Sequence, residues 1–82
     1  MHYEYKTKGT CSQRILFDIE DGVVCNLQYI GGCHGNLQGI AKLVEGMTPE
    51  DVIDRIKGIR CGMKPTSCPD QLATALTEAL NL

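Results

Sequence analysis

The dipeptide Asp21-Gly22 stands between two runs rich in Ile, Val, Phe and Tyr, and it constrains the fold more than any other feature of the sequence. Asp-Gly favours the two-residue turn whose twist matches two antiparallel strands, because both of its central residues need a positive φ. The sequence RILFDIEDGVVCNLQYI, residues 14–30, therefore predicts a β-hairpin. Strict alternation along the second strand predicts one apolar and one polar face. The predicted apolar face carries Val23, Cys25, Leu27 and Tyr29, and the opposite face carries Val24, Asn26, Gln28 and Ile30.

The rest of the chain predicts one further strand and three helices. The alternating segment HYEYKT, residues 2–7, predicts the strand. The predicted helices run from an N-cap at Asn36 to Gly46, from Thr48-Pro49 to Gly58, and from Ser67-Cys68-Pro69-Asp70 to Leu80. Strands followed by helices predict an α+β fold, with a small antiparallel sheet of two to three strands and about three helices. We expect residues 1–82 to form a single domain, because a chain of this length builds one small core.

Charge and composition narrow the classes of function. The 8 Lys and Arg residues against 10 Asp and Glu residues give a net charge of -2 without a basic stripe, so no nucleic-acid partner is expected. The first ten residues are polar and charged, and no apolar stretch is long enough to cross a membrane, which predicts a cytoplasmic protein without a membrane partner. Reducing conditions there disfavour disulfides. The 5 Cys residues are also an odd number, so they cannot all pair within one chain.

The cysteines divide into one and four by their places on the predicted elements. Cys25 lies on the predicted apolar face and is expected to be a buried thiol. The other four lie at element ends, beside glycines or at helix starts: Cys11, Cys33, Cys61 and Cys68. Cys33 and Cys68 each precede a helix, whose dipole favours the thiolate form that binds metals. No C-x-x-C spacing is present, but element ends on one side of a layered fold can meet, and four thiolates would bind zinc or iron.

Four motifs carry a family resemblance over nearly the whole chain: Gly9-Thr10-Cys11-Ser12, Gly31-Gly32-Cys33-His34-Gly35-Asn36, Cys61-Gly62, and TSCPDQLA from Thr66 to Ala73. In combination they resemble the TSCPD family, specifically its small stand-alone four-cysteine members, which are related to the C-terminal domain of adenosylcobalamin-dependent ribonucleotide reductases. The resemblance implies a metal-binding domain whose ligands are Cys11, Cys33, Cys61 and Cys68. It does not imply the reductase activity, because 82 residues cannot contain the large barrel with its radical and nucleotide sites.

The order of the elements also resembles that of iron-sulfur scaffold proteins. In those proteins, three cysteines that correspond in order to Cys11, Cys33 and Cys68 hold zinc or a nascent cluster. Ser12 stands where they have an Asp, and the chain is much shorter, so this likeness supports spatial convergence of the cysteines more than it supports cluster assembly.

Three functional hypotheses follow. The first is a zinc-binding four-cysteine module without catalysis of its own, serving a protein partner such as a reductase and accessory to ribonucleotide reduction. The second is a thiol-redox protein in which Cys61 and Cys68 cycle through a disulfide, favoured by the nearby charges of Arg60 and Lys64. The third is an iron-sulfur carrier. No residue is predicted to be catalytic: His34 is expected in a loop, where its side chain diverges from that of the adjacent cysteine, and Asp70 is expected to cap a helix.

Overall fold

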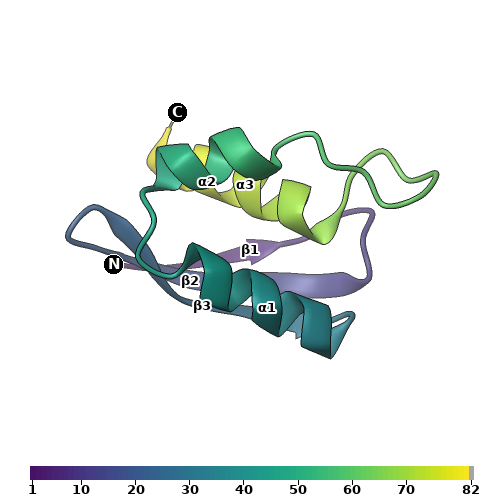
Figure 1. Ribbon diagram of the computed structural model, residues 1–82, viewed down its shortest axis with the longest axis horizontal. Coiled ribbons are helices and arrows are strands. Elements are labelled where there is room, and N and C mark those ends of the chain that lie inside the picture. Colours follow the sequence, from purple (N-terminus) through teal and green to yellow (C-terminus); the bar gives the residue numbers. More distant parts are fainter. Residues whose placement is uncertain (82) are drawn as a thin grey trace.

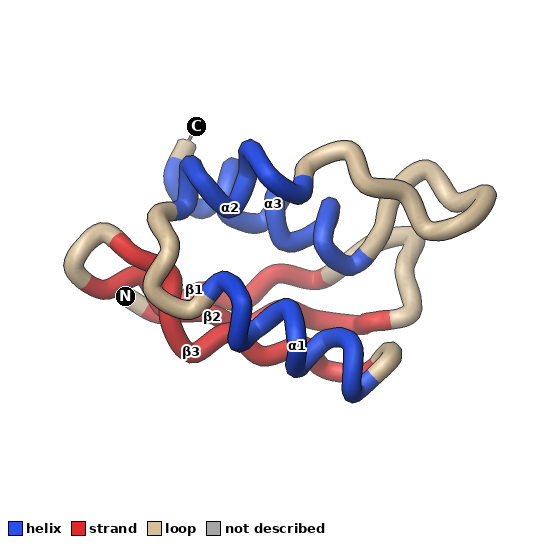
Figure 2. Tube along the Cα trace, in the orientation of Figure 1, coloured by secondary structure: helices blue, strands red, loops and turns tan. Residues whose placement is uncertain are grey.

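Three strands precede three helices along the chain, and the computed structural model describes residues 1–81. The elements are β1 (His2–Lys6), β2 (Ser12–Glu20), β3 (Val23–Gly31), α1 (His34–Val44), α2 (Pro49–Ile56) and α3 (Cys68–Leu80). The strands form one antiparallel sheet in the order β1-β2-β3. The helices form a second layer, in which α1 packs along β3 and α2 lies beside α3 (Figure 1, Figure 2). The predicted α+β fold is confirmed, including the third strand.

The Asp21-Gly22 turn has the conformation that its sequence predicts. The φ angles are 52° at Asp21 and 78° at Gly22, and the two strands pair directly across the turn. Two consecutive positive φ angles are typical of the type I′ turns that join twisted antiparallel strands. β1 then extends the sheet beyond β2, where the ring of Tyr3 stacks on Phe17 with the ring centroids 5.3 Å apart. The hairpin prediction is therefore confirmed.

A β-bulge at Asn26 changes which side chains of β3 face the helices. Leu16 pairs with Gln28, but Asp18 pairs with Cys25, so β3 has one residue more than β2 over this stretch. Asn26 accommodates the extra residue with a left-handed φ of 56°. The bulge shifts the alternation by one residue. The predicted faces are therefore correct from Leu27 onward, whereas the residues before Asn26 lie on the face opposite to the predicted one.

Because of this bulge, Cys25 lies outside the core, and its predicted burial on the apolar face is wrong. Val24 and Leu27 are the buried residues on either side of the bulge. Cys25 is half-buried and pairs with Asp18 across the sheet. Directly opposed residues share a face of the sheet, and the Asp18 carboxylate hydrogen-bonds the exposed ring of His2. The thiol of Cys25 therefore belongs to the polar face of the sheet.

The helix starts follow from capping residues, with one correction. Thr48 and Ser67 are the N-caps of α2 and α3, and each hydroxyl accepts a hydrogen bond from the backbone N–H three residues later. The N-cap of α1 is Cys33, whereas Asn36 was the predicted N-cap. The glycine pair before Cys33 has φ angles of 82° and 83°, which reverse the chain early enough for the helix to begin directly after the cysteine.

The core lies between the apolar face of the sheet and the helices. Its buried members come from β2, β3 and all three helices: Ile15, Phe17, Val24, Leu27, Val44, Val52, Leu72, Ala75 and Leu76. None of these residues lies in the connection between α2 and α3. Over residues 1–81, no helix combines the length and the apolar character that crossing a membrane requires.

Candidate functional site

The four cysteines at element ends lie on segments that share one end of the molecule. Cys11 lies in the connection between β1 and β2, Cys33 in the turn between β3 and α1, Cys61 in the connection between α2 and α3, and Cys68 at the start of α3. Figure 1 shows these segments at the right-hand end of the view, opposite the hairpin turn and the link between α1 and α2. The backbone thus brings the segments that contain all four cysteines to the same end of the molecule.

Ser12 connects the first of these segments with the last. Its hydroxyl oxygen lies 3.2 Å from Cys68 Sγ, and the residue is only 3% exposed. The hydroxyl of Thr10 lies 3.2 Å from the same oxygen and completes a small, partly buried polar group. Because Ser12 directly follows Cys11, its contact with Cys68 holds the start of α3 close to the segment that contains Cys11. The sequence offers only one signal for this role, which is the position of Ser12 beside a cysteine.

Gly32 allows the turn before α1 to lie directly against Ser12. A Cβ atom at Gly32 would lie 2.9 Å from Leu37 Cδ1 and 3.1 Å from the backbone nitrogen of Ser12, and the φ angle is 83°. A side chain at this position would therefore clash and would also be strained. Cys33 follows at the N-cap of α1, where no side chain accepts a hydrogen bond from the helix. The amide groups of the first turn of α1 are thus left for solvent or for a ligand.

The connection between α2 and α3 folds back on itself around Cys61. The N–H of Cys61 donates to the carbonyl of Thr66 at 3.1 Å, and the N–H of Lys64 donates to the carbonyl of Cys61 at 3.0 Å. The ammonium group of Lys64 lies 3.7 Å from Cys11 Sγ. This contact joins the connection to the segment between β1 and β2, although the side chain of Cys61 is exposed.

Two polar side chains of α3 fasten this connection to the rest of the fold. The Asp70 carboxylate accepts hydrogen bonds from the N–H of Gly58 at 2.6 Å and from the hydroxyl of Thr66 at 2.5 Å. The buried amide of Gln71 donates to the Thr66 hydroxyl at 3.0 Å and accepts from the N–H of Lys8 at 3.0 Å. The N-cap of α3 is Ser67, whose hydroxyl accepts a hydrogen bond from the N–H of Asp70, so the prediction that Asp70 itself caps the helix is wrong. The carboxylate of Asp70 holds the loop instead, a role that the sequence did not indicate.

Tyr29 holds the first turn of α3 from the side of the sheet. Its hydroxyl donates to the backbone carbonyl of Cys68 at 2.9 Å. Burial raises the pKa of the Tyr29 phenol, and charge on Cys68 raises it further, so the hydroxyl stays protonated and remains a donor. The alternation of β3 correctly predicted that Tyr29 faces inward, but it carried no signal for this bond to a cysteine-bearing segment.

The four thiols have the donor chemistry of a metal site, but their sulfur atoms are not gathered into one. Cys11, Cys33 and Cys61 are exposed, Cys68 is half-buried, and all are free thiols. A tetrahedral zinc site has Zn–S distances of about 2.3 Å, which places its sulfur atoms about 3.8 Å apart. Within residues 1–81, no group of three or more His, Cys, Asp or Glu side chains is arranged so that it could hold a metal ion. The segments have converged, whereas the side chains would have to turn toward one another.

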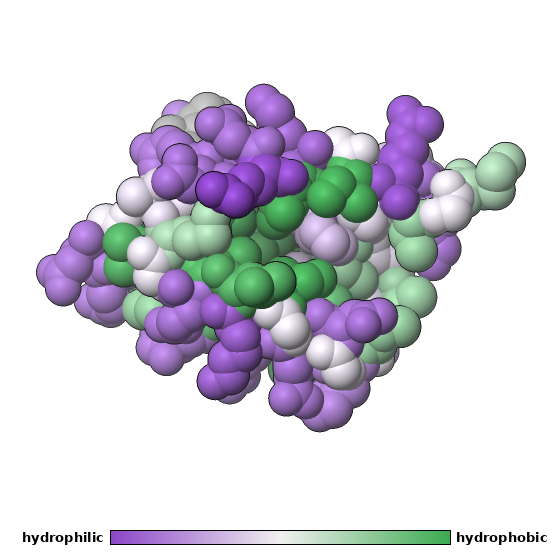
Figure 3. Space-filling view, viewed as in Figure 1, coloured by the Kyte–Doolittle hydropathy of each residue, from purple (hydrophilic) through white to green (hydrophobic). Residues whose placement is uncertain are grey.

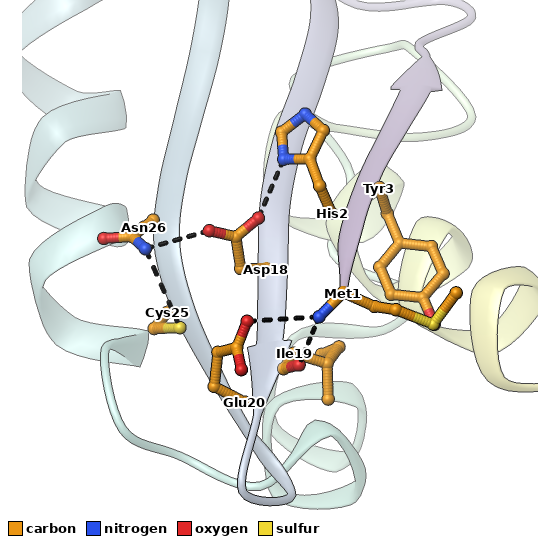
Figure 4. A network of polar contacts seen from close by, with 8 residues as sticks. All are labelled: Met1, His2, Tyr3, Asp18, Ile19, Glu20, Cys25 and Asn26. Carbon is orange, nitrogen blue, oxygen red and sulfur yellow. Dashed lines mark hydrogen bonds and ion pairs between the residues drawn. The ribbon is translucent and has the colours of Figure 1, made fainter.

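The fifth cysteine belongs to a separate polar network on the sheet (Figure 4). The Asp18 carboxylate hydrogen-bonds the amide of Asn26 at 2.9 Å and the ring of His2 at 2.8 Å, and these bonds lower the pKa of Asp18. The same Asn26 amide lies 3.9 Å from Cys25 Sγ. Burial raises the pKa of the Cys25 thiol, and nearby carboxylates, chiefly that of Glu45, raise it further. A thiol that stays protonated is a poor metal ligand and a poor nucleophile.

The imidazole ring of His34 contacts its own helix. His34 is the first residue of α1 rather than a loop residue, which corrects the prediction. Its ring nitrogen contacts the side-chain amide of Gln38, one turn further along the same helix. This contact directs the imidazole along its own helix, although His34 directly follows Cys33 in the chain.

Comparison with known proteins supports the motif-based resemblance. The TSCPD domain model matches residues 2–80, a range that begins in β1, ends in α3 and contains all five cysteines. The comparison with curated proteins found no match, and neither did the comparison with solved structures. Since the matched range covers nearly the whole chain, the protein belongs to the TSCPD domain family.

Proposed function

We propose that the protein is a zinc-binding module in which Cys11, Cys33, Cys61 and Cys68 are the ligands. The observation that carries the proposal is the meeting of their segments, seen most directly in the 3.2 Å contact between Ser12 and Cys68 Sγ. Lys64 adds a second link between two of the segments through its contact with Cys11. The proposal requires the cysteine side chains and the exposed connection to move, because within residues 1–81 the sulfur atoms do not form a group that could hold a metal ion.

Three of the four cysteines lie close to positive charge at this end of the molecule. Cys33 is the N-cap of α1, and Cys68 is the first residue of α3, so both lie at the positive end of a helix dipole. The Lys64 ammonium adds positive charge beside Cys11. Thiolates are soft ligands that prefer zinc and iron over magnesium or calcium. A bound zinc would supply cross-links between loops, and nothing in this role requires catalysis by the protein.

A structural metal also suits the size of the chain. A domain of about this length buries only roughly 60% of the surface that its unfolded chain exposes, so its core is marginal. Metal binding contributes directly to the folding free energy of such domains. We place this function in a reducing compartment such as the cytoplasm, where the thiols stay free. In line with the family resemblance, we further propose that the module serves a protein partner such as a reductase.

Metal analysis of the full chain, purified under reducing and anaerobic conditions, tests the proposal. We expect about one zinc per chain, and a cobalt-substituted sample should show sulfur-to-cobalt charge-transfer absorption. Replacement of Cys68 by Ser should reduce the bound metal strongly. Cys25→Ala is the matched control, because Cys25 lies in the separate network on the sheet, and it should retain the metal. A natively folded protein that binds no zinc or cobalt would refute the proposal.

The same samples decide between this function and the two alternatives. An iron-sulfur carrier would show bound iron and visible sulfur-to-iron absorption after anaerobic purification. A thiol-redox protein would lose two titratable thiols, those of Cys61 and Cys68, after mild oxidation. The second alternative draws support from the exposed thiol of Cys61, although Lys64 contacts Cys11 rather than either member of that pair.

A further inference from the structure

An apolar groove runs between α1 and α2, on the face shown in Figure 3, where hydrophobic residues gather between the two helices. Its volume is about 290 Å³. Val44 and Val52 are buried, while Leu43 is 79% exposed and Ile59 is 44% exposed at the surface of the groove. Ile40 of α1 and Ile56 of α2 also line the groove. Apolar side chains with this exposure leave a surface that a ligand could cover favourably.

The backbone holds this groove open. α1 packs mainly on β3, whereas α2 packs mainly on α3. The two helices therefore pack mainly against other elements rather than against each other. The link between them is tied to the sheet by two hydrogen bonds of 2.8 Å: the N–H of Val24 donates to Met47, and the N–H of Gly46 donates to Val24. Beyond the other end of α2, Gly58 is held by the Asp70 carboxylate at 2.6 Å. Both ends of α2 are therefore tied to neighbouring elements by hydrogen bonds, and the groove is present without a ligand.

The charge in the groove indicates what kind of molecule fits it. Arg55 is its only charged lining residue. Within residues 1–81 its guanidinium makes no ion pair. A guanidinium presents a planar fork of donors that matches a carboxylate, and it is most effective beside an apolar surface that excludes water. The volume lies just below the range of about 300–1,000 Å³ for small-molecule pockets, which favours a small ligand. We propose that the groove binds a free monocarboxylic acid with an apolar chain of medium length, whose carboxylate pairs with Arg55.

The test uses the full chain labelled for NMR and three probes with a ten-carbon chain: decanoate and decyltrimethylammonium, both below their micelle concentrations, and decanol below its solubility limit. Decanoate should produce saturable shifts of the methyl groups of Ile40, Leu43 and Ile56, and it should bind more tightly than either other probe. Arg55→Gln should weaken decanoate binding by about tenfold or more, as expected for loss of a charge-assisted hydrogen bond. Arg14→Gln is the control, because Arg14 is exposed on β2 outside the groove lining and should leave binding unchanged.

Three results would overturn the proposal. They are no saturable shift with decanoate, equal binding of the cationic probe, and shifts of the same methyl groups on concentration of the protein without any probe. The last result would show that a second copy of the chain covers the groove. None of these outcomes depends on the cysteines, so they leave the zinc proposal to its own experiment.

Discussion

Removal of the Asp70 carboxylate tests whether hydrogen bonds, rather than apolar packing, hold the connection that carries Cys61. Asp70→Ala removes the charge-assisted bonds from Gly58 and Thr66. Such bonds contribute about 1.5–3 kcal/mol each. Because Asp70 is half-buried, water can replace part of both bonds, so we expect the free energy of unfolding to fall by about 2–3 kcal/mol, less than the roughly 3–6 kcal/mol that two such bonds would contribute together. For a domain of this size, the loss corresponds to a decrease in Tm of about 10–20 °C.

Urea unfolding followed by circular dichroism measures this loss, and Asp70→Asn provides a graded comparison. The asparagine keeps an oxygen for the Gly58 N–H but can present its amino group to Thr66, so we expect a loss of only about 1 kcal/mol. Asp54→Ala, at an exposed position of α2, is the control and should stay within about 0.5 kcal/mol of the unmodified protein. The reasoning fails if Asp70→Ala behaves like this control, or if Asp70→Asn is the more destabilised variant.

Three further substitutions test the contacts around the site and the bulge. Tyr29→Phe removes the hydrogen bond to the first carbonyl of α3 and should lower the free energy of unfolding by about 1 kcal/mol in urea; no change would contradict the role of that bond. Gly32→Ala places a methyl group against Ser12 at a left-handed φ and should cost at least about 1 kcal/mol in the same assay; a stabilised variant would show that the turn can rearrange. Asn26→Gly keeps the left-handed bulge but removes the hydrogen bond that contributes most to lowering the pKa of Asp18. The pKa of Asp18 in this variant, measured by NMR titration, should therefore rise toward the ordinary value of 3.8. Since the folded pKa of Asp18 is lowered, its contribution to stability is present above the ordinary pKa and is lost as the pH falls through the folded pKa; an unchanged titration in Asn26→Gly would refute this cause.

The local signals in the sequence predicted the elements well, because each rests on interactions between near neighbours. Asp21-Gly22 set the turn, and the hydroxyls of Thr48 and Ser67 set two helix starts. The bulge at Asn26 could not be foreseen in this way. It follows from how β3 pairs with β2, and an Asn in an otherwise regular strand is a weak signal for it. The resulting shift of one residue moved Cys25 from the predicted core to the polar face.

The sequence also predicted which cysteines share one end of the fold, but not what holds their segments together. The positions of the four cysteines at element ends were readable, since glycines and caps mark those ends. The supporting contacts of Ser12, Tyr29 and Gln71 connect residues that are 39 to 63 positions apart. Local patterns carry no information about such distant pairs. The orientation of each sulfur atom depends on rotamers and on the exposed connection, which the sequence leaves undetermined.

The connection between α2 and α3 has few apolar contacts of its own, and this determines what a bound metal would change. Ile59 is 44% exposed and Met63 is fully exposed, so the segment relies on the hydrogen bonds of Asp70 and Gln71. Water competes for such bonds at the surface, and segments of this kind open at a lower free energy than the core does. Metal–sulfur bonds would join the segment to its neighbours independently of the core. Protection of residues 57–66 from amide hydrogen exchange should then rise toward that of the strands when zinc binds. A rise in Tm without this local effect would instead place the metal elsewhere on the molecule.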